Sequence, residues 1–417
     1  MRIPNMEFGL RQNISQGAGC ISKLKEILQR ESWKRVLLVC GPTLYKSGAA
    51  QSVEQQLKDA EVTYEVFTNI RPNPEASTID NEAVPLALKF KPDVIVAVGG
   101  GSTLDTAKGI AFVGDSGKPV LDYTIFRVPP STCFAHKTYP LIAIPTTAGT
   151  GSEVCKNAVI SDEAGLKLVL AHEVILPKYA LLDPDMLKTM PFSVAAATSM
   201  DTFVQALETF TNRNANDFTR TQSLRALEHI GQHIRAFCAN PADAEAANGM
   251  SLACMYAGFS LGLAGIGQDH IITHPMSEDP FYISHGEACA MVLPAVIEYN
   301  GLSCKELYRQ AFNALTGMCL MEHEFEVQDL VDWVVDLNDD LHIAGDKSFA
   351  ECGYTEELLE KIMAHPVIQG AVARNASADD TEFPRHTSLD DFRAIIKRMV
   401  VYSQAQSDRA KARKTQV

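Results

Sequence analysis

The sequence has few of the features that mark proteins of nucleic acids, membranes or the secretory pathway. Asp and Glu outnumber Lys and Arg by 51 to 37, and the net charge of -14 argues against nucleic acid or an anionic membrane as the main partner. No run approaches eighteen uninterrupted apolar residues, and the start (Met1-Arg2-Ile3-Pro4) lacks the apolar stretch of a signal peptide. We therefore expect a cytoplasmic protein without a membrane partner.

The ten cysteines do not form a recognisable framework. They are scattered along the chain, and no C-x-x-C pair occurs. We expect reduced thiols, with Cys40 and Cys155 as small core residues because both lie within or beside apolar, strand-like runs.

The length of 417 residues suits two domains. In the first half, apolar runs at 36–39, 63–67 and 93–98 alternate with helical patterns at 47–60 and 77–90, which predicts a doubly wound α/β domain with a parallel sheet. Strand signals become sparse after Leu182-Asp183-Pro184, and helical patterns follow at 193–211, 219–237, 243–265 and 287–299. We place the domain boundary near residue 185, between an α/β domain (1–185) and an all-α domain (186–417).

Two loops rich in small residues follow predicted strands. Gly99-Gly100-Gly101-Ser102 comes directly after the third strand and precedes a helix that opens at Thr103. Glycines there allow close approach of a ligand, and the free N–H groups of the helix favour an anion such as a pyrophosphate. The run lacks the last glycine of the dinucleotide fingerprint, because Leu104 stands there, and a simple tight turn stays open. The second loop, at 145–153, follows the apolar run 141–144; its hydroxyl and glycine residues could bind a phosphate or a ribose, or form a solvated linker.

Three of the eleven histidines fall within sixteen residues. His270 and His274 are four apart, a spacing that places two side chains on one face of a helix, and His285 follows after a short loop. The group could hold a metal or a substrate, or each histidine could cap or pack locally. Asp201 and Gln205 are also four apart on a mainly apolar helix. Asp201 could add a carboxylate to a metal site, or the two could form a structural hydrogen-bonded pair.

Taken together, these motifs resemble the iron-containing (group III) alcohol dehydrogenase family, from about residue 5 to 400. The resemblance implies a dinucleotide-binding domain, a helical domain of dehydroquinate synthase-like architecture, and a divalent metal, often Fe²⁺, in the cleft between them. It implies that Asp201, His270 and His285 are metal ligands, that Gln205 occupies the fourth ligand position, and that His274 lies near the nicotinamide and the substrate. The implied cofactor-binding residues are Gly41, Asn73, Gly99, Gly100, Gly101, Ser102, Asp105, Lys108, Thr146, Thr147, Thr150 and Ser152.

The function that the resemblance implies is an NAD(P)-dependent oxidoreductase that interconverts an alcohol and an aldehyde or ketone. The metal would act as a Lewis acid on the substrate oxygen, hydride would pass to or from the nicotinamide, and His274 could relay the proton. The implied partners are a small-molecule alcohol or aldehyde and a second copy of the chain in a homodimer.

Three positions depart from the family pattern. Gln205 stands where the family usually has a histidine, and its neutral oxygen is a weaker ligand than imidazole, so the site could bind metal weakly, prefer another metal such as Zn²⁺, or bind none. The segment between His274 and His285 is one residue longer than usual and carries Glu278 and Asp279. Cys40-Gly41 replaces an aspartate that many NAD-using members have after the first strand, which predicts that NADP is accepted or preferred.

Three alternatives remain at this stage. A metal-independent reductase of the maleylacetate reductase type shares the architecture, and Gln205 favours it. A dehydroquinate synthase-like lyase needs a Lys and Arg cluster, and the site helices at 199–208 and 264–275 contain neither residue type. A binding module without catalysis would bind the cofactor without turnover.

Overall fold

A computed structural model of the 417-residue chain describes residues 11–125, 127–129, 132–278, 281–343, 349, 351, 353–375 and 382–415. These residues form two compact units. The N-terminal unit contains the described residues through Met190 together with Ala242–Ser251, and the C-terminal unit contains Pro191–Pro241 and the described residues from Leu252 onward. The two units are described separately below.

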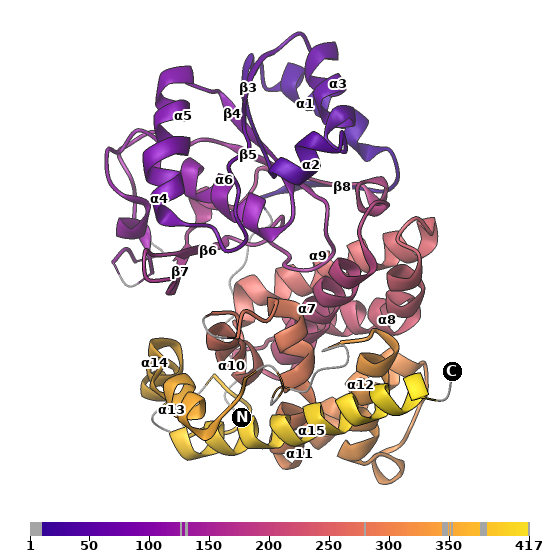
Figure 1. Cartoon of the computed structure of the whole chain (residues 1–417). Coiled ribbons are helices and arrows are strands. Elements are labelled where there is room, and N and C mark those ends of the chain that lie inside the picture. The colour runs from indigo at the N-terminus through magenta and orange to yellow at the C-terminus, as the bar shows by residue number, and fades with distance from the viewer. Residues whose placement is uncertain are drawn as a thin grey trace. The chain divides into compact units, whose positions relative to one another are not determined.

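A six-stranded parallel sheet forms the centre of the N-terminal unit (Figure 1). Its strand order is β1-β8-β5-β4-β2-β3. The strands are β1 (Asn13–Gln16), β2 (Arg35–Cys40), β3 (Thr63–Phe67), β4 (Val94–Gly99), β5 (Leu141–Pro145) and β8 (Tyr179–Leu182). A separate antiparallel hairpin pairs β6 (Asn157–Ser161) with β7 (Lys167–Ala171). The parallel sheet that the sequence predicted is confirmed.

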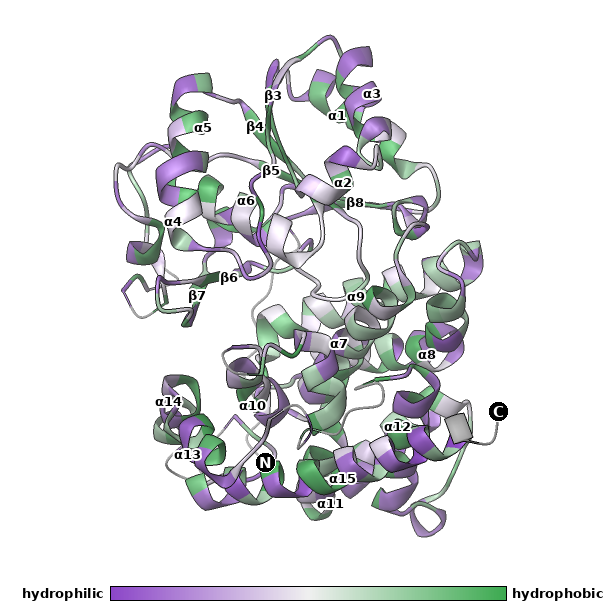
Figure 2. Cartoon of the chain, viewed as in Figure 1, coloured by the Kyte–Doolittle hydropathy of each residue, from purple (hydrophilic) through white to green (hydrophobic). Residues whose placement is uncertain are grey.

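Both faces of the sheet are buried, because alternate residues of each strand enter different cores. Leu37 and Val39 of β2 pack with helices α5 (Val84–Phe90) and α6 (Gly101–Val113), whereas Val36 and Leu38 pack with α1 (Lys23–Arg30) and α3 (Gln51–Asp59). A strand buried on both faces is continuously apolar, and Figure 2 shows β4 in the hydrophobic colour along its length. This property made the central strands recognisable in the sequence.

Some elements differ from the predicted ones. The helix predicted at 47–60 is two helices, α2 (Pro42–Lys46) and α3, because Gly48 between them has a φ of 79°, which a right-handed helix cannot contain. The predicted helix at 77–90 is α4 (Ala76–Thr78), a π-helical turn (Ile79–Ala83) and α5. Strands β1, β6, β7 and β8 were not predicted.

The C-terminal unit is helical, as predicted. Helix α7 (Phe192–Thr211) packs against α8 (Asp217–Ala239) and α11 (His285–Thr316), and α10 (Gln268–Met276) packs against α11 (Figure 1). The other helices are α9 (Ala244–Ala264), whose first turns belong to the N-terminal unit, α12 (Val327–Asp340), α13 (Glu356–Ala364), α14 (Pro366–Arg374) and α15 (Leu389–Thr415).

The predicted helices at 193–211, 219–237 and 243–265 are confirmed, but α11 begins at His285, before the predicted start at residue 287. Within the described residues no single helix has the length and hydropathy to cross a membrane; only α9 and α10 taken together pass that test, and they are bent by 101°.

Candidate functional site

The two small-residue loops of the N-terminal unit lie against each other. Gly99 and Pro145 are neighbours at the ends of β4 and β5, and Thr146 N donates to Gly99 O at 3.1 Å. A methyl group on Gly100 would lie 3.1 Å from the Thr147 side chain, and one on Gly101 would lie 2.5 Å from Thr150. A side chain at Gly101 would displace Thr150, and one at Gly100 would crowd Thr147, so glycines at both positions allow the two loops to approach this closely. The structure brings together residues that are more than 40 positions apart.

These loops lie at the point where the strand order reverses. The chain runs from β2 to β3 on one side and places β4 and then β5 on the other side of β2. The crevice at the carboxyl ends of the strands on either side of such a reversal is where open α/β sheets bind ligands. Gly41, which follows β2, lies there too, because its Cβ position is 3.7 Å from Thr103 Oγ1, the side chain that also faces Gly99.

Helix α6 begins in this crevice. Gly100 is its N-cap, and no side chain caps its first N–H groups. The half-buried Ser102 stands in the first turn. An uncapped helix start at a glycine run is a suitable site for the negative charge of a phosphate.

Lys108 and Asp105 of α6 hold the second loop in place. The Lys108 ammonium is fully buried and donates to Ser152 Oγ at 2.8 Å, to Cys155 O at 2.9 Å and to Asn157 O at 2.6 Å. Asp105 accepts from Ser152 Oγ at 2.6 Å and from Val159 N at 2.9 Å. Burial raises the pKa of Asp105, and nearby Lys108 opposes that rise. Lys108, Asp105 and Ser152 thus hold the second loop in its shape through hydrogen bonds inside the unit. Direct contact of these three side chains with the cofactor stays a prediction.

Asn73 stands apart from these loops in the sequence. It lies after β3 with a φ of 55°, a left-handed conformation that asparagine adopts more easily than most residues, and its side chain is exposed. Its place in a cofactor site stays a prediction.

A second group of predicted residues gathers in the C-terminal unit. Asp201 on α7, His270 on α10 and His285 at the start of α11 place one ligand atom each within 4.8 Å of one another, together with the sulfur of Cys289. Asp201 Oδ1 lies 3.5 Å from His270 Nε2 and 3.8 Å from His285 Nε2. Asp201 and His270 are about 95% buried, whereas a third of the His285 side chain is exposed. Sequence spacing and structure thus agree that these residues are neighbours.

Glu208, one helical turn beyond Gln205, fixes the orientation of His270. Its Oε2 accepts from His270 Nδ1 at 2.6 Å and from Gly267 N at 2.8 Å, and its Oε1 accepts from Asp269 N at 2.7 Å. A carboxylate on Nδ1 leaves the lone pair on Nε2 facing Asp201 and His285, the arrangement found around histidines that bind metals. His270 Nε2 makes no hydrogen bond with the described residues.

The charges around His270 favour a positive charge at this point. Burial alone would lower the pKa of His270, but the carboxylates of Glu208 and Asp201 outweigh it and raise that pKa to about 10. Burial would raise the pKa of Asp201, but His270 and His285 outweigh it and lower that pKa. A divalent cation satisfies the same need more strongly than a proton does. The donor set, the orientation of His270 and the local charge all fit a bound divalent metal.

Gln205 lies beside the group, but its amide nitrogen faces the carboxylate. Nε2 donates to Asp201 Oδ1 at 2.8 Å, whereas Oε1 is buried without a hydrogen-bond partner among the described residues. An amide nitrogen has no lone pair to offer a metal, so in this orientation Gln205 presents a donor to Asp201. Its ligand role stays a prediction.

His274 is half-buried on α10, one turn beyond His270, and its ring is perpendicular to that of His285 with 6.2 Å between centroids. Glu278, in the longer segment that follows, does not reach this group; its Oε2 lies 3.2 Å from His365 Nε2. Asp279 lies outside the described residues.

Two residues of this site were not identified from the sequence. Cys289 belongs to the metal-ligand group, and Glu208 orients His270. The signal for Cys289 was its position four residues after His285, but the predicted helix began at residue 287 and left His285 outside it. The signal for Glu208 was its spacing from Asp201. Seven residues make about two helical turns, so the two side chains lie on the same face of the helix.

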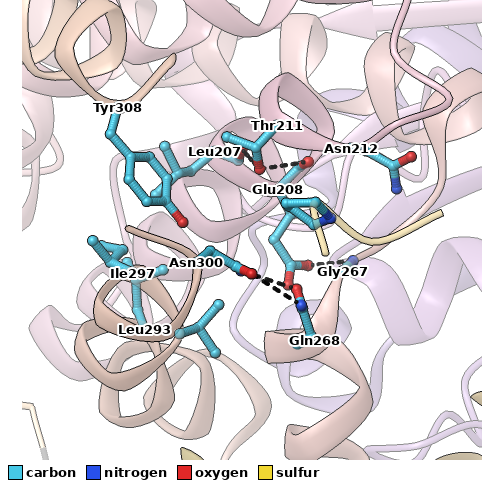
Figure 3. Close-up of a pocket in the computed structure, with 12 residues that line it drawn as sticks. Leu207, Glu208, Thr211, Asn212, Gly267, Gln268, Leu293, Ile297, Asn300 and Tyr308 are labelled. Atoms are coloured by element: carbon cyan, nitrogen blue, oxygen red, sulfur yellow. Dashed lines mark hydrogen bonds between the residues drawn. The ribbon is translucent and has the colours of Figure 1, made fainter. Parts of the chain in front are cut away.

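A small cavity of about 10 Å³, with room for one water molecule, lies between α7, α10 and α11 and shares Glu208 with the site. Figure 3 shows Glu208 reaching toward Gly267, with the amides of Gln268 and Asn300 paired at 3.2 Å beside it. The cavity is too small for a cofactor or a substrate, and we interpret it as part of the polar support behind His270.

Comparison with known proteins agrees with this geometry. Residues 12–184 match the family described as iron-containing alcohol dehydrogenase, and residues 195–400 match its C-terminal domain family. The chain belongs to the iron-containing alcohol dehydrogenase family. Among its relatives, choline dehydrogenase of Bacillus subtilis is 31% identical over 87% of this chain and 90% of its own length. Long-chain-alcohol dehydrogenase 1 of Geobacillus thermodenitrificans is 31% identical over 85% and 88%. The solved alcohol dehydrogenase from Oenococcus oeni is 28% identical, covers 93% of this chain and 98% of its own, and superposes with a TM-score of 0.83.

Membership of this family gives the reaction class. The chain is an iron-type alcohol dehydrogenase or aldehyde reductase, an oxidoreductase that interconverts an alcohol and an aldehyde with NAD(H), and the family implies a divalent metal. The metal-independent reductase and the lyase are not favoured. The substrate class is a small-molecule alcohol or aldehyde.

Proposed function

We propose that this chain is a metal-dependent, NADPH-accepting aldehyde reductase whose metal is held by Asp201, His270 and His285. The observation that carries this proposal is the convergence of those three ligand atoms within 4.8 Å, with His270 held by Glu208. Two imidazoles and a carboxylate suit a ferrous ion, with Zn²⁺ as the main competitor. When bound, the metal supplies a Lewis acid for the substrate oxygen.

The chain's own residues supply position and proton transfer. In the oxidation direction an alcohol loses a hydride to the nicotinamide and a proton from its hydroxyl, and reduction reverses both transfers. We assign the proton to a ring nitrogen of His274, which is half-buried next to His285 and is not one of the three ligands. Gly99, Gly100 and Gly101 at the start of α6 would bind the pyrophosphate, and the hydroxyls of Thr146, Thr147 and Thr150 in the adjoining loop would donate to it.

The cofactor preference follows from the end of β2. Gly41 carries no side chain, so no carboxylate there repels the 2′-phosphate of NADP. The variant Gly41→Asp tests this point, because Gly41 has an ordinary φ of -61° and a Cβ there would meet Thr103 at a normal 3.7 Å. We expect kcat/KM for NADPH to fall about tenfold relative to NADH in this variant. The reason is repulsion between the new carboxylate and the 2′-phosphate, which would cost about 1–2 kcal/mol. A wild-type enzyme with strong NADH preference would contradict the proposal.

The metal requirement has a direct test. Protein purified without chelator should contain about one metal per chain, and EDTA should remove the metal and the NAD(P)H-linked reduction of aldehydes together, with Fe²⁺ or Zn²⁺ restoring both. The variant Asp201→Asn should lose metal and activity, whereas Asp217→Asn, at an exposed position of α8, should change neither. Full activity without metal would reject the proposal in favour of the metal-independent reductase.

The substrate panel follows from the relatives' names, which include a choline dehydrogenase, a long-chain-alcohol dehydrogenase and an Escherichia coli lactaldehyde reductase. A cationic, a long apolar and a short hydroxylated substrate, each with its aldehyde, sample these three pocket chemistries.

We further propose that the enzyme works in the cytoplasm as a homodimer. Six buried cysteines, Cys20, Cys40, Cys155, Cys238, Cys289 and Cys304, are free thiols, which suits a reducing compartment. A mass twice that of one chain by light scattering supports the dimer, and a single-chain mass contradicts it.

A further inference from the structure

Cys289 is fully buried on α11, one helical turn after His285. Its sulfur lies 3.8 Å from His285 Nε2 and 3.9 Å from the Thr273 hydroxyl, and it belongs to the group whose ligand atoms are all within 4.8 Å of one another. The other members of that group are the three residues to which the proposed function assigns the metal. A thiol, the side chain with the highest affinity for Zn²⁺ in such a set, therefore stands inside the site.

Within the same group, His270 Nε2, on a residue that is 5% exposed, is buried without a hydrogen-bond partner among the described residues. A buried polar atom without a partner is rare, and an ion is one of its ordinary explanations. This atom gives evidence for a cation that does not depend on Cys289.

We propose that Cys289 is the fourth protein ligand of the metal, in the role that Gln205 does not fill, and that its sulfur makes the site prefer Zn²⁺ to Fe²⁺. This inference rests on the proposed metal-dependent function. It goes further by assigning a ligand and a metal preference.

The separations between the ligand atoms suit four protein donors around one ion, and the substrate oxygen would be a fifth ligand, because catalytic zinc can expand to five-coordinate. With metal–nitrogen and metal–oxygen distances of about 2.0–2.1 Å and a metal–sulfur distance of about 2.3 Å, a tetrahedral zinc site has N···O edges of about 3.3 Å and S···N edges of about 3.6 Å. The observed edges are 3.5 and 3.8 Å from Asp201 Oδ1 to the two histidines, and 3.8 Å from Cys289 to His285. The other three edges are no longer than 4.8 Å, so side-chain adjustments of up to about an ångström would bring all four donors onto one ion.

The chemistry of the four donors gives the metal preference. Two histidines and one carboxylate form the ligand set typical of non-haem Fe²⁺, whereas a thiolate added to it favours the softer Zn²⁺. When the metal binds, the S–H bond of Cys289 breaks, a metal–sulfur bond forms, and the proton leaves to solvent. No oxidant or reductant is involved.

Gln205 offers the competing explanation. Rotation of its amide by half a turn would present Oε1 to the metal, but it would also turn the donor Nε2 away from Asp201 Oδ1, 2.8 Å away in this structure. An amide oxygen gives no charge-transfer band with a transition metal, whereas a thiolate gives an intense one. Spectroscopy therefore separates the two ligands.

The first experiment loads the metal-free protein with Co²⁺, which takes the place of Zn²⁺ and reports its ligands by absorbance. We expect the wild-type protein to show a thiolate-to-cobalt charge-transfer band in the near ultraviolet. Cys289→Ser should lose that band and keep weaker visible bands, while Cys304→Ser, which alters another buried cysteine of α11, should retain it. A wild-type spectrum without the band, or a band that persists in Cys289→Ser, would overturn the proposal.

The second experiment measures metal selection without activity. Dialysis against equal Zn²⁺ and Fe²⁺ under nitrogen, followed by metal analysis, should leave zinc in the wild-type and Cys304→Ser proteins. Cys289→Ser should lose more than about a hundredfold in zinc affinity, beyond the 10–100-fold typical of losing an outer-shell partner. If Gln205→Ala loses zinc and Cys289→Ser keeps it, the fourth protein ligand is Gln205 and the proposal is wrong.

The two proposals fail in different ways. If the wild-type protein binds neither Zn²⁺ nor Co²⁺, the metal-dependent function fails with the inference. If it binds both and loses them in Asp201→Asn but not in Cys289→Ser, the function holds and only the role of Cys289 fails.

Discussion

Replacing Glu208 by glutamine is predicted to weaken both the folding of the C-terminal unit and its metal site. The Glu208 carboxylate is buried and accepts three hydrogen bonds, from His270 Nδ1 and from the backbone N–H groups of Gly267 and Asp269 at the start of α10. Glutamine keeps the shape of the side chain, but it has one acceptor oxygen and places an NH₂ group where the second accepted.

The expected loss is about 2–4 kcal/mol. An amide oxygen can accept two of the three hydrogen bonds, so at least one hydrogen bond to a charged group is lost, about 1.5–3 kcal/mol. Loss of the negative charge at the N-terminus of α10 adds about 0.3–1 kcal/mol. Because His270 is no longer held by a carboxylate, metal affinity should also fall by about 10–100-fold.

Urea unfolding of the metal-free proteins measures the first effect, and zinc titration measures the second. The matched control is Glu306→Gln, an exposed carboxylate on α11 that pairs with Arg309, which should change stability by less than about 0.5 kcal/mol. If Glu208→Gln matches the wild type in both urea midpoint and zinc affinity, Glu208 does not support His270 as we describe.

Three further predictions concern other parts of the molecule. Lys108→Met should lower stability by about 3–5 kcal/mol, because it removes a buried cation that donates three hydrogen bonds and lies near the Asp105 carboxylate, whereas Lys58→Met at an exposed site of α3 should be neutral in the same urea assay. Burial lowers the pKa of His229 to about 4. Between pH 6.5 and pH 4 the unfolded chain therefore binds a proton at His229 and the folded chain does not, so the free energy of unfolding falls by roughly 3 kcal/mol as the pH drops through this range. The variant His229→Gln should reduce this loss. Alkylation followed by mass spectrometry should modify the exposed Cys133 and Cys319 before any of the seven buried cysteines described.

The central strands and the glycine loops could be predicted because their signals are local. β2 and β4 are buried on both faces and so are continuously apolar, and Gly100 and Gly101 face the second loop where a side chain would be crowded. β1 and β8 pair with each other across more than 160 residues, and strands of only four residues have no local signal that distinguishes them from loops.

The site was predictable in part for the same reason. His270 and Asp201 were identified by residue type and spacing, but which way a polar side chain faces depends on the packing of other helices. The sequence did not reveal that the Lys108 ammonium is enclosed by the second loop, or that the Gln205 amide nitrogen faces Asp201. Cys289 became visible only when α11 was found to begin at His285.

The measurement that tests the central claim most directly is anomalous diffraction from crystals of the protein grown with Zn²⁺, recorded at the zinc absorption edge. The account predicts one strong peak per chain, within bonding distance of Asp201, His270, His285 and Cys289. A peak elsewhere, or no peak in a protein that still reduces aldehydes with NAD(P)H, would contradict it.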